Sequence, residues 1–194
     1  MRTASIIINW TIFVATFALT LRCFRHEGEW ALRRGLKAFR YFTVLSNVFC
    51  AITALVMALA QMKNAVAPAV LLLKYLGTVS VTVTLLTVFL FLGPTQGYRT
   101  MLEGDNLYMH LFGPVLAIVS FCCLEKQPFS FPVALLGLLP VALYGALYLY
   151  RVIYAPEATR WEDFYGFNMG GKWPLSFAAM LLGTLLVCVA LWLA

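Results

Sequence analysis

The sequence is poor in charge. Only 11% of its 194 residues are Asp, Glu, Lys or Arg, whereas soluble domains average about 25%. Hydrophobic residues make up 62% of the chain, against about 45–50% in soluble domains. A water-soluble globule of this length has too small an interior to hide that surplus. These proportions exclude a soluble enzyme, a DNA-binding domain and a disordered linker, and they predict an integral membrane protein that crosses the bilayer several times.

The sequence also lacks the motifs that hold metals, nucleotides or phosphates. Its two histidines, His26 and His110, lie in unrelated contexts, and no carboxylates cluster at ligand spacing. Neither a GxxxxGK[ST] nor a GxGxxG motif occurs. The five cysteines form no CxxC pair, and four of them lie in apolar runs, as is typical of small buried hydrophobic residues. We therefore expect no metal, no cofactor and no nucleic-acid partner.

The sequence does contain six long apolar runs. Each is close to the roughly 20 residues that cross about 30 Å of hydrocarbon. The runs lie near Ala4–Leu21, Tyr41–Met62, Val70–Leu92, Asn106–Leu124, Phe131–Tyr150 and Pro174–Leu193. They predict an all-α polytopic membrane protein, a six-transmembrane-helix bundle that forms a single domain over residues 1–194. Pro114 and Pro140 lie inside two of these runs and are expected to kink the helices or free a carbonyl.

The loop between the first two runs has a helical pattern of its own. Leu32, Leu36 and Phe39 share one face, while the opposite face is charged. This pattern predicts an amphipathic interfacial helix that lies along the membrane surface.

Lys and Arg are distributed unevenly between the two ends of the spans. Side A denotes the first, third and fifth loops, and side B denotes the other loops and the N-terminus. Side A carries Arg22, Arg25, Arg33, Arg34, Lys37, Arg40, Arg99, Arg151, Arg160 and Lys172, whereas side B carries Arg2, Lys63, Lys74 and Lys126. The positive-inside rule therefore predicts that the side A loops are cytoplasmic and that both termini are outside. Lys74 is expected to snorkel outward from the third span.

Two spans begin at side A with polar residues on one face. Thr43, Asn47 and Cys50 are spaced i, i+4, i+7 in the second span, and Asn106 and His110 open the fourth. At about 1.5 Å per residue, Thr43 and His110 lie at similar depth. A hydroxyl beside an imidazole is the minimum needed for nucleophilic attack on an acyl carbon. The alternative is that the threonine caps or packs its helix and the histidine only bridges helices.

The loop before the last span, Arg160–Pro174, combines aromatic and polar residues. One interpretation is a set of interfacial aromatics. The other is a lid that contacts substrate and that hinges at two adjacent glycines. The candidate substrate-binding residues in this loop and in the third are Arg99, Arg160, Trp161, Tyr165 and Asn168. Asp163 and Asp105 are alternative partners for orienting the histidine.

Three stretches resemble a known family. YFTVLSN at 41–47 resembles the Y-F-T-x-x-S/T-N signature that opens the second helix of bacterial Pr-six-Pr membrane proteins. DNLYMHLFGPVLAIVSFCCLE at 105–125 is similar to their His-x-x-x-Pro fourth helix, and WEDFYGFN at 161–168 resembles the loop before their last helix. That family is similar to the androgen-induced-gene family of eukaryotic membrane hydrolases, which cleave fatty acid esters of hydroxy fatty acids with an intramembrane Thr and His. The resemblance implies a bacterial plasma membrane, with Thr43 as nucleophile and His110 as base. Related acyltransferases use a Cys–His pair, which leaves Cys50 as an alternative nucleophile.

Together these observations lead us to expect a membrane hydrolase of a lipid ester. Asn47 or Asn106 would donate a hydrogen bond to the oxyanion. The basic residues Arg99 and Arg160 favour a lipid that carries a carboxylate or phosphate. The alternatives are a protein that binds or transports a lipid or small molecule without catalysis, a Cys–His acyltransferase, and a purely structural six-helix protein. Membrane lipids are the expected partners, and the oligomeric state is left open.

Overall fold

The protein is an all-α helical bundle in the computed structural model, which describes residues 1–125 and 128–194. Six of its helical segments are long and apolar enough to cross a membrane, which confirms the predicted number of spans. They are Arg2–Cys23, Phe42–Met62, Pro68–Gln96, Asp105–Glu125, Phe131–Tyr154 and Trp173–Leu193. The third and fifth run further than predicted. In the third span an α-helical turn, Gly93–Gln96, follows the π-helical turn Val88–Leu92, and in the fifth a π-helical turn, Tyr150–Tyr154, continues the helix.

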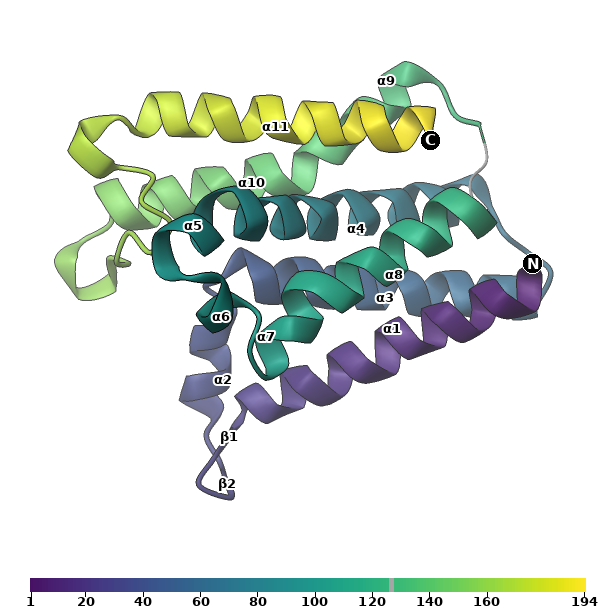
Figure 1. The fold of residues 1–194 in the computed structure, drawn as a ribbon, viewed down its shortest axis with the longest axis horizontal. Helices are drawn as coiled ribbons and strands as arrows, with labels where there is room; N and C mark the ends of the chain where they lie inside the picture. The colour runs from purple at the N-terminus through teal and green to yellow at the C-terminus, as the bar shows by residue number, and fades with distance from the viewer. Residues whose placement is uncertain (126–127) are drawn as a thin grey trace. The chain divides into compact units, whose positions relative to one another are not determined.

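The chain divides into two compact units, residues 1–128 and 129–194. The first unit is built on four helices, α1 (Arg2–Cys23), α3 (Phe42–Met62), α4 (Pro68–Thr87) and α8 (Gly113–Ser120) (Figure 1). α1 and α4 each pack against both α3 and α8. Shorter elements extend or join these helices: the hairpin β1 (Arg25–His26) and β2 (Glu29–Trp30), α2 (Leu32–Ala38), η1 (Val88–Leu92), α5 (Gly93–Gln96), α6 (Tyr98–Met101), α7 (Asp105–Leu107), η2 (Tyr108–Phe112) and η3 (Phe121–Glu125).

The second unit contains the last two spans and the loop between them. Its elements are α9 (Phe131–Ala134), η4 (Leu135–Gly137), α10 (Leu138–Leu149), η5 (Tyr150–Tyr154), η6 (Glu157–Thr159), η7 (Met169–Gly171) and α11 (Trp173–Leu193). α10 packs against α11, and the indole N–H of Trp192 donates to the carbonyl of Phe129 (2.8 Å).

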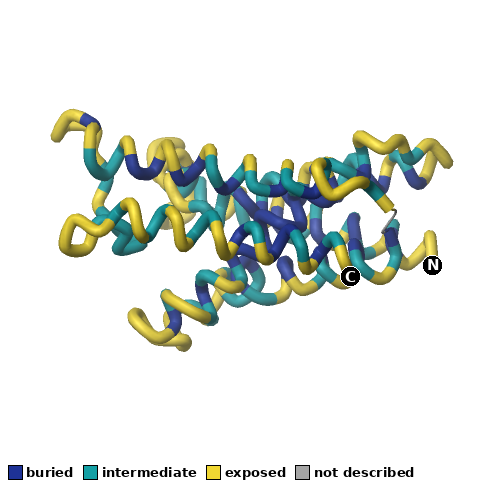
Figure 2. Tube along the Cα trace, turned by 90° about the horizontal axis from the view of Figure 1, so that it is seen from above, coloured by how far each residue is buried: buried dark blue, intermediate teal, exposed yellow. Residues whose placement is uncertain are grey.

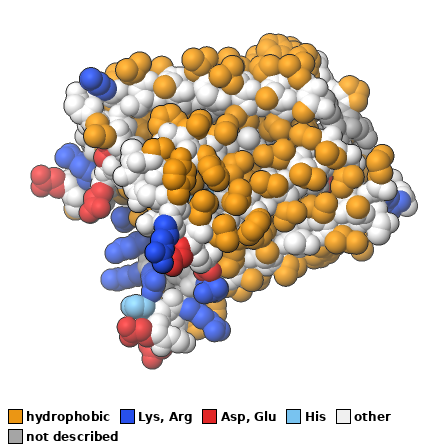
Figure 3. All heavy atoms as spheres, in the orientation of Figure 1, with side chains coloured by type: hydrophobic (Ala, Val, Ile, Leu, Met, Phe, Trp, Pro, Cys, Tyr) orange, Lys and Arg blue, Asp and Glu red, His pale blue; other side chains and the backbone are white. Residues whose placement is uncertain are grey.

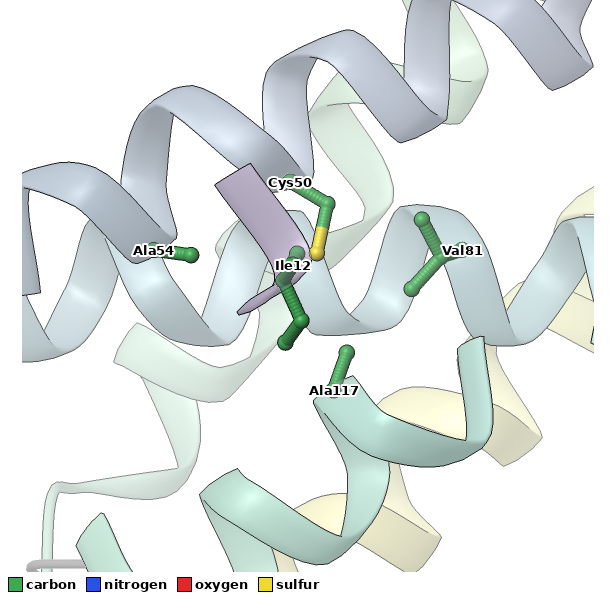
Figure 4. Packing of buried hydrophobic residues seen from close by; sticks show 5 residues of the cluster. All are labelled: Ile12, Cys50, Ala54, Val81 and Ala117. Atoms are coloured by element: carbon green, nitrogen blue, oxygen red, sulfur yellow. The ribbon is translucent and has the colours of Figure 1, made fainter. Parts of the chain in front are cut away.

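Small and medium-sized side chains fill the centre of the first unit. Ile12, Cys50, Ala54, Val81 and Ala117 come from its four main helices and point into one shared space (Figure 4). Buried and exposed positions alternate along the helices (Figure 2), so each helix has one side against its neighbours. Lipid tails are as apolar as these side chains, so close packing rather than escape from water holds such helices together.

A glycine on α4 sets the distance between α3 and α4. A Cβ at Gly77 would lie 2.4 Å from Thr53 Oγ1 and 3.1 Å from the Cα of Cys50. We expect Gly77→Leu to force the two helices apart and to lower the free energy of unfolding by about 1–3 kcal/mol. Gly183→Ala in α11 is the control, because a Cβ there meets open space. Unfolding by SDS in detergent micelles measures both variants; equal stability would show that the α3–α4 contact is not tight.

The prolines inside the spans change the type of helix before them. Proline has no N–H and its ring clashes with the carbonyl four residues earlier. The structure has the π-helix η2 immediately before Gly113 and Pro114, and the 3₁₀ turn η4 shortly before Pro140. η2 contains His110, so the proline acts on the segment that holds this imidazole.

The first loop forms a helix where one was predicted, α2, together with a short hairpin that was not. The apolar side chains of Leu32 and Leu36 are exposed, and the ring of Phe24 packs over Gly35. Lys and Arg side chains gather around the hairpin and α2, while hydrophobic side chains cover the spans (Figure 3).

Candidate functional site

The structure brings Thr43 and His110 together. Thr43 is the second residue of α3, and His110 lies in η2. Thr43 Oγ1 lies 3.3 Å from His110 Nε2. The imidazole is buried and the threonine is partly exposed.

A backbone carbonyl fixes the tautomer of His110. The Nδ1 atom lies 2.6 Å from the carbonyl oxygen of Met101, at the end of α6. A carbonyl only accepts hydrogen bonds, so Nδ1 carries the proton and Nε2 of the neutral ring has its lone pair free. The Thr43 hydroxyl therefore donates to Nε2. A general base needs this arrangement with the group that it deprotonates.

The side chain of Asn47 ties the two halves of the site together. Its Nδ2 donates to the carbonyl of Thr43 one turn earlier (2.8 Å) and to the carbonyl of Met109 in η2 (2.9 Å). Both amide hydrogens are thus engaged, and neither is free for an oxyanion in this arrangement. A Cβ at Gly113 would lie 3.2 Å from Asn47 Oδ1, so the contact between α3 and α8 is close here. Asn47 is therefore placed to position the dyad.

Replacing the Asn47 amide tests whether this side chain positions the Thr43–His110 dyad. We expect Asn47→Leu to lower the free energy of unfolding by about 1–3 kcal/mol, because the Met109 carbonyl loses its donor. It should also lower kcat while KM changes little. Ser46→Ala is the control. Its hydroxyl also lies within hydrogen-bond distance of the Thr43 carbonyl (3.2 Å), but its second contact is with Thr84 Oγ1 (2.8 Å) on α4 instead of with η2. If both variants keep the wild-type kcat, Asn47 does not position the dyad.

The other polar candidates of the first unit have partners of their own. Asp105 pairs with Arg22 (2.8 Å), both of them exposed. The atom that holds His110 Nδ1 is thus the Met101 carbonyl, not the Asp105 carboxylate. Asn106 donates to the carbonyl of Thr100 (3.3 Å). Arg99 is exposed on α6, the short helix that ends at Met101.

The candidates of the second unit form an ordered loop around Asp163. Its carboxylate accepts hydrogen bonds from the Tyr148 hydroxyl (2.8 Å) and from the backbone N–H groups of Phe167 and Asn168 (2.9 and 2.7 Å). The rings of Trp161 and Tyr165 pack around Tyr148, with centroids 6.4 and 5.3 Å from its ring. Arg160 donates to the Ala155 carbonyl (3.1 Å). These contacts fix the conformation of the loop, and its role as a lid stays a prediction.

Cys50 lies within the apolar cluster of the first unit. Its side chain is 1% exposed, and its sulfur faces Ile12 and Val81 (Figure 4). This is the environment of a packing residue.

A second polar cluster, which was not predicted from the sequence, surrounds Lys74, and the expectation that Lys74 snorkels outward is wrong. The Lys74 side chain is fully buried instead of snorkelling, and its Nζ lies 3.7 Å from Glu125 Oε2. Burial is possible because α1 supplies Asn9, whose Oδ1 accepts from Nζ (2.5 Å). The signal was present: an ionisable residue within a span is expected to have an intramembrane partner, and Glu125 ends the fourth span. Of the remaining side B residues, Lys126 lies outside the described residues.

Comparisons with known proteins add no relative: no protein-family model, no curated protein and no solved structure matches the chain.

Proposed function

We propose that the protein hydrolyses a lipid ester with Thr43 as nucleophile and His110 as general base. The observation that carries the proposal is the continuous chain of contacts from the Met101 carbonyl through His110 to the Thr43 hydroxyl. Thr43 Oγ attacks the acyl carbon while Nε2 takes its proton. The protonated ring then donates that proton to the leaving alcohol, and water, deprotonated by the same nitrogen, releases the fatty acid from the threonine ester.

The surroundings of the dyad favour a substrate with a long acyl chain and an anionic group. Apolar helices flank the site, and a lipid can reach it sideways from the side A leaflet. Arg99 is exposed on α6, the short helix whose last residue supplies the carbonyl that holds His110. Positive charge attracts a carboxylate or phosphate. Fatty acid esters of hydroxy fatty acids combine both features and are the substrates that the family resemblance implies.

The proposal is tested on the purified protein in detergent with a panel of acyl esters and a fluorophosphonate probe. We expect ester turnover and covalent labelling, both retained in Cys50→Ala. Loss of both in that variant would indicate the Cys–His alternative. Ligand-dependent thermal stabilisation without turnover or labelling would instead indicate a binding or transport protein.

We further propose that the side A loops face the cytoplasm of a bacterial plasma membrane. Because Lys74 is buried within a span, it does not count among the Lys and Arg residues of the side B loops. The excess of Lys and Arg in the side A loops is therefore larger than the sequence count, which supports this orientation. Single cysteines introduced as Lys37→Cys and Lys63→Cys test it, each in a chain whose five native cysteines are replaced by alanine, because Cys123 is itself exposed. An impermeant maleimide added to intact cells should label the Lys63 position and reach the Lys37 position only after permeabilisation. The reverse pattern would invert the orientation.

A further inference from the structure

A buried polar cluster occupies the end of the first unit opposite the dyad. Each of the four main spans of this unit contributes to it, through Ser5 and Asn9 of α1, Gln61 of α3, Lys74 of α4, Ser120 of α8 and Glu125 of η3. Gln61 lies at the far end of α3 from Thr43. All six side chains are buried, and the proposed hydrolysis uses none of them.

The two oxygens of Glu125 differ in their surroundings. Oε1 accepts hydrogen bonds from Ser5 Oγ (2.6 Å), from Ser120 Oγ (2.6 Å) and from Asn9 Nδ2. Oε2 accepts no hydrogen bond from the described residues and lies 3.7 Å from Lys74 Nζ. Three hydrogen-bond donors thus converge on one oxygen. The other oxygen is left facing a positive charge.

The ammonium group of Lys74 lies in oxygen-rich surroundings. Its nearest partner is Asn9 Oδ1 at 2.5 Å, with the Glu125 carboxylate beyond. Gln61 Nε2 donates to Ser5 Oγ (2.8 Å), and the Ser5 hydroxyl donates its one hydrogen to Glu125. The amide oxygen of Gln61 lies 3.1 Å from Ser5 Oγ, at the edge of the same network. Amide, hydroxyl and carboxylate oxygens are the ligands of hard cations. One positive charge balances the single negative charge of the cluster.

We propose that the cluster is a monovalent-cation site that the Lys74 ammonium occupies from within. The tethered ammonium takes the place of a free ion and joins the four spans at this end without depending on the salt outside. In a variant without the Lys74 side chain, the oxygens of the cluster remain, and the negative charge of the Glu125 carboxylate has no balancing positive charge. That carboxylate must take up either a proton or a small cation.

The experiment compares Lys74→Ala with wild type and with Lys74→Ala/Glu125→Gln. Each is unfolded and refolded in detergent at alkaline pH, where protonation of the carboxylate competes least. The added salts are sodium, potassium or methylammonium chloride, with choline chloride as the cation too large for the site. The readouts are the recovery of folded protein and its Tm.

We expect at least one small cation to raise the Tm of Lys74→Ala by about 5 °C over choline. Wild type should not respond, because its site is filled, and the double variant should not respond, because its charge is gone. Lys74→Ser serves as a second variant that leaves the same space and adds a hydroxyl. The proposal is overturned if neither single variant gains Tm or folded recovery from any small cation, or if the double variant gains as much as they do.

Discussion

Thr43→Ala is expected to reduce ester hydrolysis to background, and His110→Ala to lower kcat by about 10²–10⁴-fold. The threonine supplies the attacking oxygen, so no residual pathway through an acyl-enzyme remains without it. The histidine supplies the base, and its loss leaves a hydroxyl that is rarely deprotonated at neutral pH. Kinetics on the ester that wild type turns over best measure both variants, and a double variant should be no worse than Thr43→Ala because the two act as a unit.

A matched control distinguishes chemistry from packing. Thr184→Val removes a buried threonine hydroxyl of α11 that bonds the carbonyl one turn earlier (2.8 Å). It should keep full activity. Circular dichroism and SDS unfolding should show that the Thr43 and His110 variants fold. Folded variants that retain activity would show that the 3.3 Å contact is structural.

The second large effect concerns stability. Lys74→Met or Glu125→Gln alone is expected to lower the free energy of unfolding by about 3–5 kcal/mol, because each leaves a buried group without its partner. The double variant should recover most of that loss, because it buries no unpaired charge. SDS unfolding of the four proteins gives the coupling between the two residues.

Lys63→Met is the control for this cycle. It removes an exposed lysine at the C-terminal end of α3 and should change stability by less than about 0.5 kcal/mol. If the losses of stability in the double variant are additive, Lys74 and Glu125 act independently. That result would contradict the interpretation of these two fully buried side chains as an ion pair.

The six spans could be predicted from the sequence because their signal is one of length and composition. Helix direction also places Thr43 and His110 at one depth, and no further information was needed to expect them near each other. The tautomer of His110 could not be predicted in this way. The tautomer depends on the Met101 carbonyl, a backbone atom at the end of the short helix α6. The identity of a side chain does not reveal where its backbone carbonyl will point.

The buried cluster shows a different limit. Lys74 lies near the end of a span, where a snorkelling lysine and a paired lysine have the same sequence pattern. The choice between them depends on which residues α1 and η3 turn toward it. Helical periodicity predicts which residues share a face of one helix. How each helix is rotated relative to its neighbours depends on the packing of all four main helices of the first unit.

Locating the covalent adduct of a fluorophosphonate probe shows whether Thr43 is the nucleophile. The intact protein is labelled in detergent, digested and examined by mass spectrometry. We expect an adduct on Thr43 that is absent when His110 is replaced by Ala. An adduct on Cys50, or ester turnover with Thr43 replaced by Ala, would contradict it.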